Sequence, residues 1–156
     1  MKFLTLACCL VTGAAVLSTS AAATVPPALE ATFQTLPLKM QGSGMVLGDP
    51  TVLGGADFEA SGTASHLGSW TNEGVLEIDP ATGAATGSVV FTAANGDHLN
   101  GVFEGTFDSA TGIAVAVFEW TGGTGRFAAA SGSAGFVVYQ DPTGSFLFEA
   151  NGTLDI

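Results

Sequence analysis

The sequence predicts an all-β fold, an eight-stranded antiparallel up-and-down barrel. Between residues 33 and 156, apolar or small residues alternate with polar or charged ones along many segments. No segment shows the 3.6-residue period of a helix. Turn motifs recur at regular spacing, which indicates consecutive strands of about ten residues in a meander. Eight strands close into a barrel just wide enough for side chains or one small ligand. A β-sandwich of the same strands is the alternative.

Three strands are expected in the first half of the chain. The first covers residues 36–47 and bends at its glycines. The second covers 56–66, where small residues form one face and charged or hydroxyl residues form the other. The third covers 70–78, with Trp70 and the residues that alternate with it on one face.

Turn motifs divide the second half into five strands. Segments 79–83, 108–112 and 141–144 each begin with Asp, whose side chain can accept hydrogen bonds within a turn, and end with Gly, where positive φ is needed. Asn95-Gly96-Asp97 is a strong hairpin signal. The strands between these turns are expected at 85–94, 98–107, 112–121, 132–140 and 145–155.

Segment 121–134 interrupts this pattern with four glycines and the chain's single arginine, Arg126. Glycine allows one backbone to approach another closely. We therefore expect this segment to pack one strand tightly against the next and to close the sheet on itself.

Two stretches carry a family resemblance. Gly123-Thr124-Gly125-Arg126-Phe127-Ala128, followed later by Asp141-Pro142-Thr143-Gly144, resembles a segment of the allene oxide cyclase and dirigent-like barrels. Residues 62–71 resemble the G-T-A-T-H-L-G-R-F-T pattern of uncharacterised secreted bacterial proteins. The resemblance implies an eight-stranded barrel, often trimeric, with an apolar cavity, so a homo-oligomer is one expectation. No catalytic residue of allene oxide cyclase matches a position here, so the resemblance bears on fold rather than activity.

The N-terminal region predicts secretion. Lys2, an apolar run from residue 4 to 17 and small residues at 21–23 are typical of a signal peptide covering residues 1–23. Residues 24–32 are then a flexible lead-in and 33–156 a single domain. Cys8 and Cys9 also permit a lipoprotein, but the apolar run continues beyond them. Cleavage would remove both cysteines, so the secreted domain would be stabilised without disulfides.

The charge balance excludes several classes of partner. After residue 23 the chain has two basic residues, Lys39 and Arg126, against 14 acids, a formal charge of −12. Nucleic acids and anionic membrane surfaces need clustered Lys and Arg, so neither is an expected partner. The acids indicate a soluble, self-repelling surface or, alternatively, a divalent cation site. No acidic spacing matches an EF-hand loop, and we predict no metal and no cofactor.

Five residues are candidates for ligand binding: His66, Trp70, Glu119, Trp120 and Arg126. His66 ends an apolar strand face, so it would either reach into a barrel mouth or fix the following turn. The tryptophans would line a site or belong to the core. Glu119 shares its face with Ile113, Val115 and Val117 and is expected to pair with Arg126, with catalysis as the alternative.

These observations allow two functions. The first is a secreted, non-enzymatic barrel that binds a small apolar or amphipathic molecule or serves as an extracellular structural component. The alternative is a cyclase- or dirigent-like protein that shapes a reactive substrate in its cavity, with His66 or Glu119 facing it. No Ser-His-Asp spacing or nucleotide-binding fingerprint is present, so an enzyme is the less favoured expectation.

Overall fold

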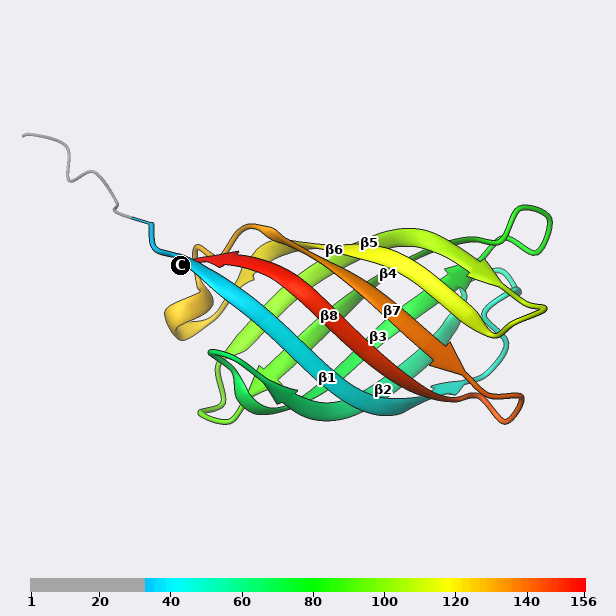
Figure 1. Cartoon of the computed structure of the whole chain (residues 1–156), viewed down its shortest axis with the longest axis horizontal. Helices are drawn as coiled ribbons and strands as arrows, with labels where there is room; N and C mark the ends of the chain where they lie inside the picture. Colours follow the sequence, from blue (N-terminus) through cyan, green and yellow to red (C-terminus); the bar gives the residue numbers. More distant parts are fainter. Residues whose placement is uncertain (1–32) are drawn as a thin grey trace, which may run out of the picture. The chain divides into compact units, whose positions relative to one another are not determined.

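Eight antiparallel strands pair in chain order and close into a barrel (Figure 1). A computed structural model describes residues 33–156. The predicted up-and-down barrel is confirmed, and the sandwich alternative is excluded because the sheet has no free edge. The signal peptide and the lead-in were predicted for residues that lie outside the described part. The strands are β1 (Thr35–Leu47), β2 (Ala56–Ala64), β3 (Gly68–Ile78), β4 (Ala84–Ala93), β5 (His98–Asp108), β6 (Ile113–Gly123), β7 (Ser133–Gln140) and β8 (Ser145–Asp155).

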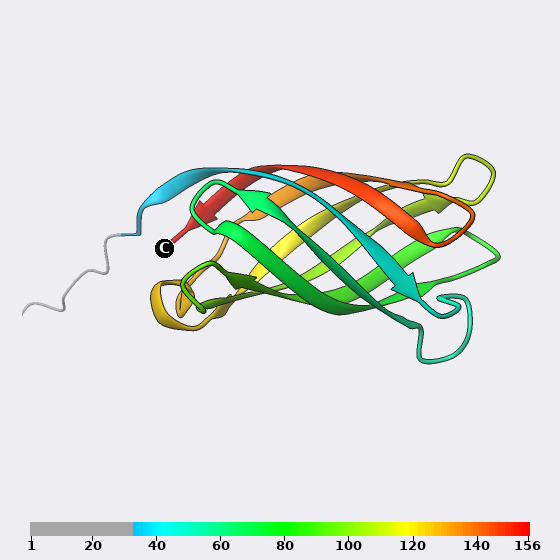
Figure 2. The ribbon, with the colours of Figure 1, turned by 90° about the horizontal axis from the view of Figure 1, so that it is seen from below.

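Closure of the barrel depends on the pairing of β1 with β8. Their register runs from Thr35 opposite Asp155 to Met45 opposite Ser145. Both views show the two strands side by side (Figure 1 and Figure 2). The expectation that segment 121–134 closes the sheet is therefore wrong. That segment joins β6 to β7, which are already neighbours, through a short 3-10 turn, η1 (Gly125–Phe127).

The small residues of β1 and β2 make room for a large side chain from β3. A Cβ added at Gly42 or at Gly62 would lie 2.6 Å from the indole of Trp70. Real Cβ atoms do not approach other heavy atoms so closely, and the backbone carbonyls of Ser61 and Gln41 lie equally near or nearer, so these positions exclude larger side chains. The small-residue face predicted for 56–66 is thus explained by the indole that it accommodates.

The up-and-down order places alternate loops at opposite ends of the barrel. We call the end with loops 48–55, 79–83, 109–112 and 141–144 the Asp-loop end, because an Asp lies at or beside the start of each loop: Asp49, Asp79, Asp108 and Asp141. We call the other end, with loops 65–67, 94–97 and 124–132, the plug end. Figure 1 shows η1 and the C-terminus together at the plug end.

The four Asp side chains accept hydrogen bonds within their own loops, as predicted for three of them. The backbone N–H of Ala81 donates to Asp79, and that of Ala110 donates to Asp108, both over 2.9 Å. The glycines that follow have positive φ, +72° at Gly83 and +70° at Gly112. Such turns reverse the chain within a few residues and hold the ends of adjacent strands in register.

Aromatic side chains from most strands form one continuous core. Trp70 packs against Phe91 and Phe148, with ring centroids 5.2 and 5.3 Å apart. Phe118 stacks on Phe136 at 4.0 Å. In the part of the chain that the structure describes, no helix has the length and apolar character needed to span a membrane.

Candidate functional site

The two ends of the barrel are filled differently, and the plug end is closed by packed side chains. Phe127 of η1 and Leu99 of β5 are both 0% exposed, and Leu67 and Leu154 are almost fully buried. The turn is held by the N–H of Phe127, which donates to the carbonyl of Thr124 over 2.9 Å. We call segment 124–132 the stopper, because it buries Phe127 and Ala130 in this end of the barrel while most of its other residues stay exposed.

The predicted ligand-binding residues His66 and Arg126 meet at this closed end, on its surface. His66 is exposed in the β2–β3 turn with φ +66°, and its carbonyl accepts a hydrogen bond from Nη2 of Arg126. The Arg126 guanidinium also lies 4.7 Å from the centre of the Phe127 ring. These contacts connect two loops and leave the imidazole facing away from the barrel interior.

The predicted pair between Glu119 and Arg126 does not form. Among residues 33–156 no ion pair joins them, and Glu119 is exposed on the outer face of β6, opposite Ser133. The prediction failed because β6 is apolar on both faces. The inner face consists of Ala114, Ala116, Phe118 and Trp120, whereas the outer face carries the exposed Ile113, Val115 and Val117. Alternation alone could not tell these two faces apart.

Trp70 and Trp120 belong to the core in the plug-end half of the barrel. They are 2% and 5% exposed. The indole N–H of Trp120 donates to the carbonyl of Thr153 over 3.1 Å. The structure therefore places none of the five predicted residues at an accessible interior space.

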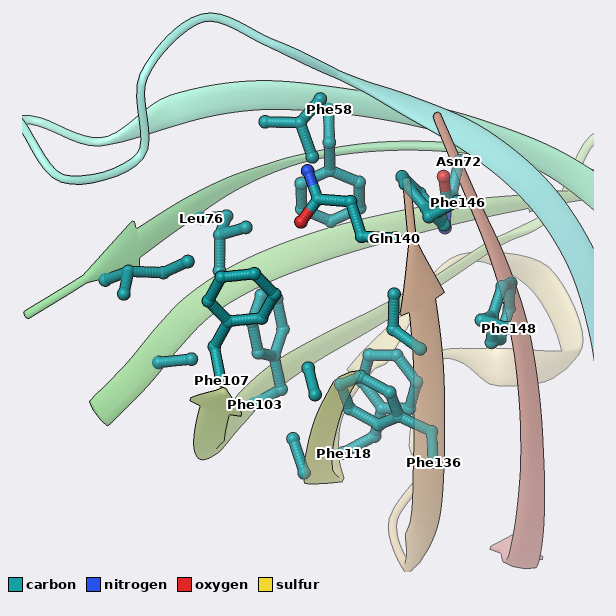
Figure 3. Close-up of a pocket in the computed structure, with 16 residues that line it drawn as sticks. Phe58, Asn72, Leu76, Phe103, Phe107, Phe118, Phe136, Gln140, Phe146 and Phe148 are labelled. Atoms are coloured by element: carbon teal, nitrogen blue, oxygen red, sulfur yellow. The ribbon is translucent and has the colours of Figure 1, made fainter. Parts of the chain in front are cut away.

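An accessible interior space lies instead at the Asp-loop end (Figure 3). This cavity has a volume of about 80 Å³ for the centre of a water-sized sphere. It extends from Ile78, Ala85 and Gln140 at the strand ends to Asn72 near the middle of β3. Its lining is Val46, Phe58, Asn72, Leu76, Ile78, Ala85, Phe103, Phe107, Ala114, Ala116, Phe118, Phe136, Val138, Gln140, Phe146 and Phe148.

The shape of the cavity follows from the size of the inward residues. Phe rings come from β2, β5, β6, β7 and β8, and Figure 3 shows them around a common space. Neighbouring positions carry only methyl groups, at Ala85, Ala114 and Ala116. The edge-to-face pair of Phe58 and Phe103, 6.1 Å apart, leaves volume that these methyl groups do not fill. For comparison, an engineered apolar cavity of about 150 Å³ holds benzene.

One polar side chain lies on the cavity floor. Asn72 is 8% exposed and is the only buried polar or charged residue in the described barrel. Its Oδ1 atom has no hydrogen-bond partner in the structure. The residues opposite it in the sheet are Ala60 on β2 and Phe91 on β4, neither of which has a side-chain donor. Sequence reasoning missed Asn72, although it stands alone among the apolar residues that alternate with Trp70.

Carboxylates surround the mouth of this cavity. The pKa of Asp49 is lowered mainly by a hydrogen bond from the hydroxyl of Thr51 and next by one from the Thr51 backbone N–H. The corresponding bonds from Thr143 lower the pKa of Asp141. For Asp79 and Asp108 the pKa is lowered first by the backbone N–H of Ala81 and Ala110. All four side chains are exposed. The mouth is therefore ringed by groups that stay ionised in mildly acidic solution.

The outer wall has a second, shallower depression. It measures about 730 Å³, is bounded by Met45, Glu59, Tyr139 and other residues, and shares Asn72 and Phe146 with the interior cavity. Although it is larger than the interior cavity, it lies on the solvent face of the sheet, and polar side chains form part of its wall. The interior cavity is the better candidate, because its walls are aromatic and come from most strands of the barrel.

Exposed apolar residues form a row across three strands of the outer wall. Ile113, Tyr139 and Leu147 are paired across β6, β7 and β8, and Val115 is 56% exposed beside them. The expectation of a homo-oligomer stays a prediction. Within residues 33–156, no three His, Cys, Asp or Glu side chains are grouped as a metal ion would require.

The sequence matches no protein-family model, and no curated protein or solved structure matches it significantly.

Proposed function

We propose that the protein binds a small apolar molecule in the aromatic cavity at the Asp-loop end. The observation that carries the proposal is the cavity itself. It is an apolar space at one end of the barrel, whereas buried side chains fill the other end. Pockets of this kind, with a few polar groups in an apolar lining, are the usual form of small-molecule sites. On the sequence prediction of a signal peptide, we place this role outside the cytoplasm.

The family relationship is part of the same proposal. Residues 62–71 and 123–128 resemble the allene oxide cyclase-like barrels, and the closed eight-stranded architecture is compatible with that relationship. A cyclase- or dirigent-like activity has no comparable support. His66 and Glu119, the residues expected to face its substrate, are exposed and do not line the cavity.

Two neighbouring alanines provide a matched test. Ala85 points inward and lines the cavity, whereas Ala84 is exposed on the outer wall. Xenon and benzene are suitable probes, because both bind dry apolar cavities. In the native protein we expect each probe to shift the amide resonances of β3, β5 and β7 near the Asp-loop end, with little change at the plug end.

The variant Ala85→Leu should fill the cavity and abolish these shifts, whereas Ala84→Leu should preserve them. The folded state should tolerate Ala85→Leu well, because the new side chain enters existing space instead of displacing its neighbours. If neither probe shifts any resonance of the native protein, the binding role is wrong and the extracellular structural role is the remaining prediction.

A further inference from the structure

We infer that the ligand is a neutral molecule with a hydroxyl group at the inner end of an apolar body, and that Asn72 accepts a hydrogen bond from this hydroxyl. The inference rests on the proposed function, since it concerns the same cavity. It goes further by assigning the ligand a functional group and an orientation.

The first argument is that Asn72 has a buried polar atom without a hydrogen-bond partner. A buried polar atom without a partner destabilises the folded state, and an apolar residue of similar size would avoid that cost. The side-chain amide is 8% exposed, its Oδ1 is unpartnered, and its cross-strand neighbours are Ala60 and Phe91. The fold therefore provides no hydrogen-bond donor for this acceptor, and the residue that carries it lines the cavity.

The second argument is position. Asn72 lies near the middle of β3, while Ile78 and Gln140 lie at the strand ends that form the mouth. Phe58, Phe103 and Phe146 line the same space (Figure 3). A molecule that enters through the mouth thus meets aromatic side chains along its length and the amide at its leading end.

The third argument is charge. An anion buried in this cavity would need a positive partner. The basic residues of the described chain, Lys39 and Arg126, are both exposed on the outside: Lys39 bonds through its backbone to Ser65 of the plug end, and Arg126 lies in the plug. Four ionised Asp side chains surround the mouth instead. Carboxylate ligands such as fatty acids are therefore disfavoured, and a neutral hydroxyl suits the neutral amide.

The fourth argument is size. A cavity of about 80 Å³ is roughly half the volume of the engineered site that encloses benzene. A slender alkyl chain can enter with its hydroxyl leading and leave its far end in the mouth. A bulky polycyclic molecule cannot be enclosed.

Three probes of matched size test the inference: 1-hexanol, methyl pentyl ether and hexanoate. The alcohol can donate a hydrogen bond, the ether can only accept one, and hexanoate is charged. We expect 1-hexanol to bind the native protein about tenfold more tightly than the ether. Hexanoate should bind more weakly than either. Dissociation constants would come from chemical-shift titrations of the full barrel, which also report where each probe binds.

Asn72→Leu supplies the decisive comparison, because leucine has a similar volume and no polar atom. In this variant the alcohol and the ether should bind equally, while the exterior variant Asn151→Leu should retain the native preference. Equal affinity of the two probes for the native protein would overturn the inference and leave apolar binding intact. Failure of every probe to bind both the native protein and Asn72→Leu would instead overturn the proposed function.

Discussion

Phenylalanine side chains lie at both ends of the barrel, but they fill the interior at one end and surround a cavity at the other. At the plug end, Phe127 comes from a loop and fills the interior, so that its ring is 0% exposed. At the Asp-loop end, Phe107 and Phe146 come from the strands themselves, are only partly buried and surround a cavity. The difference lies in the connections. Even the eight-residue loop 48–55 leaves its apolar residues Val52 and Leu53 exposed, whereas segment 124–132 buries Phe127 and Ala130. Aromatic content alone therefore does not decide which end is solid.

The largest expected effect is at the stopper. Phe127→Ala should lower the free energy of unfolding by about 3 to 5 kcal/mol, because it removes a fully buried ring and leaves a cavity. Phe107→Ala is the matched change at the other end and should cost about 1 to 2 kcal/mol, since its ring buries less area. Urea denaturation of both variants measures the difference. Equal losses would contradict the contrast between a solid and an open end.

The next effect has the opposite sign. Asn72→Leu should raise the free energy of unfolding by roughly 1 to 3 kcal/mol, because it removes an unpartnered buried acceptor. The same urea series provides the measurement, with Asn151→Leu as the exposed control, for which we expect a change within about 0.5 kcal/mol. A destabilised Asn72→Leu protein would show that the amide supports the fold, and it would weaken the case for a binding role.

A smaller loss is expected at Arg126. Arg126→Ala removes one hydrogen bond to the carbonyl of His66 and the contact with Phe127, and it should cost about 0.5 to 1.5 kcal/mol. Glu119→Gln should not recover any of this loss, since the two side chains are not paired. The double variant should equal the sum of the single changes. If the double variant instead recovered thermal stability, that result would support the ion pair between Glu119 and Arg126 that the sequence predicted.

The smallest expected effect is a local loss of stability at low pH. The pKa values of Asp49, Asp79, Asp108 and Asp141 lie below the ordinary Asp value of 3.8, so these groups release their protons more readily in the folded state. Their contribution to stability is complete above pH 3.8 and is lost as the pH falls through the lower folded values. We therefore expect amide exchange to increase first at the Asp-loop end between about pH 4 and pH 2.

The double variant Asp79→Asn with Asp108→Asn provides the control for the acid effect. Its stability should change less with pH over the same interval, because two of the four titrating groups are gone. Uniform loss of protection at both ends of the native barrel would argue against a local effect of the Asp loops.

Some features were predictable because they depend on a few adjacent residues. Asn95-Gly96, Asp79 and Asp108 marked turns correctly, since a side chain that bonds its own loop and a glycine with positive φ need no distant partner. The strand boundaries followed from these turns to within a few residues. The alternation in β3 also placed Trp70, Leu76 and Ile78 on one face, which the structure shows to be the inward face.

The candidate site was not predictable in the same way. His66 was expected either inside a mouth or in a structural role at the following turn. The structure places it in the turn, because β2 ends at Ala64 and the chain leaves the alternation with positive φ at His66. Glu119 was expected to pair with Arg126 because the residues on its face of the strand are apolar. Those residues lie on the outer face of β6, a strand that is apolar on both faces. Asn72 was visible as a lone polar residue, yet its significance depends on Ala60 and Phe91 beside it.

The sequence by itself determined the strands, the turns and their up-and-down order, because alternation and turn chemistry are local properties of the chain. Only the tertiary structure decided the register in which β1 pairs with β8, that Phe127 fills one end, and that the Phe rings leave a space beside Asn72. These outcomes depend on the volumes and contacts of residues far apart in the sequence. Packing of that kind is fixed only when all eight strands are in place.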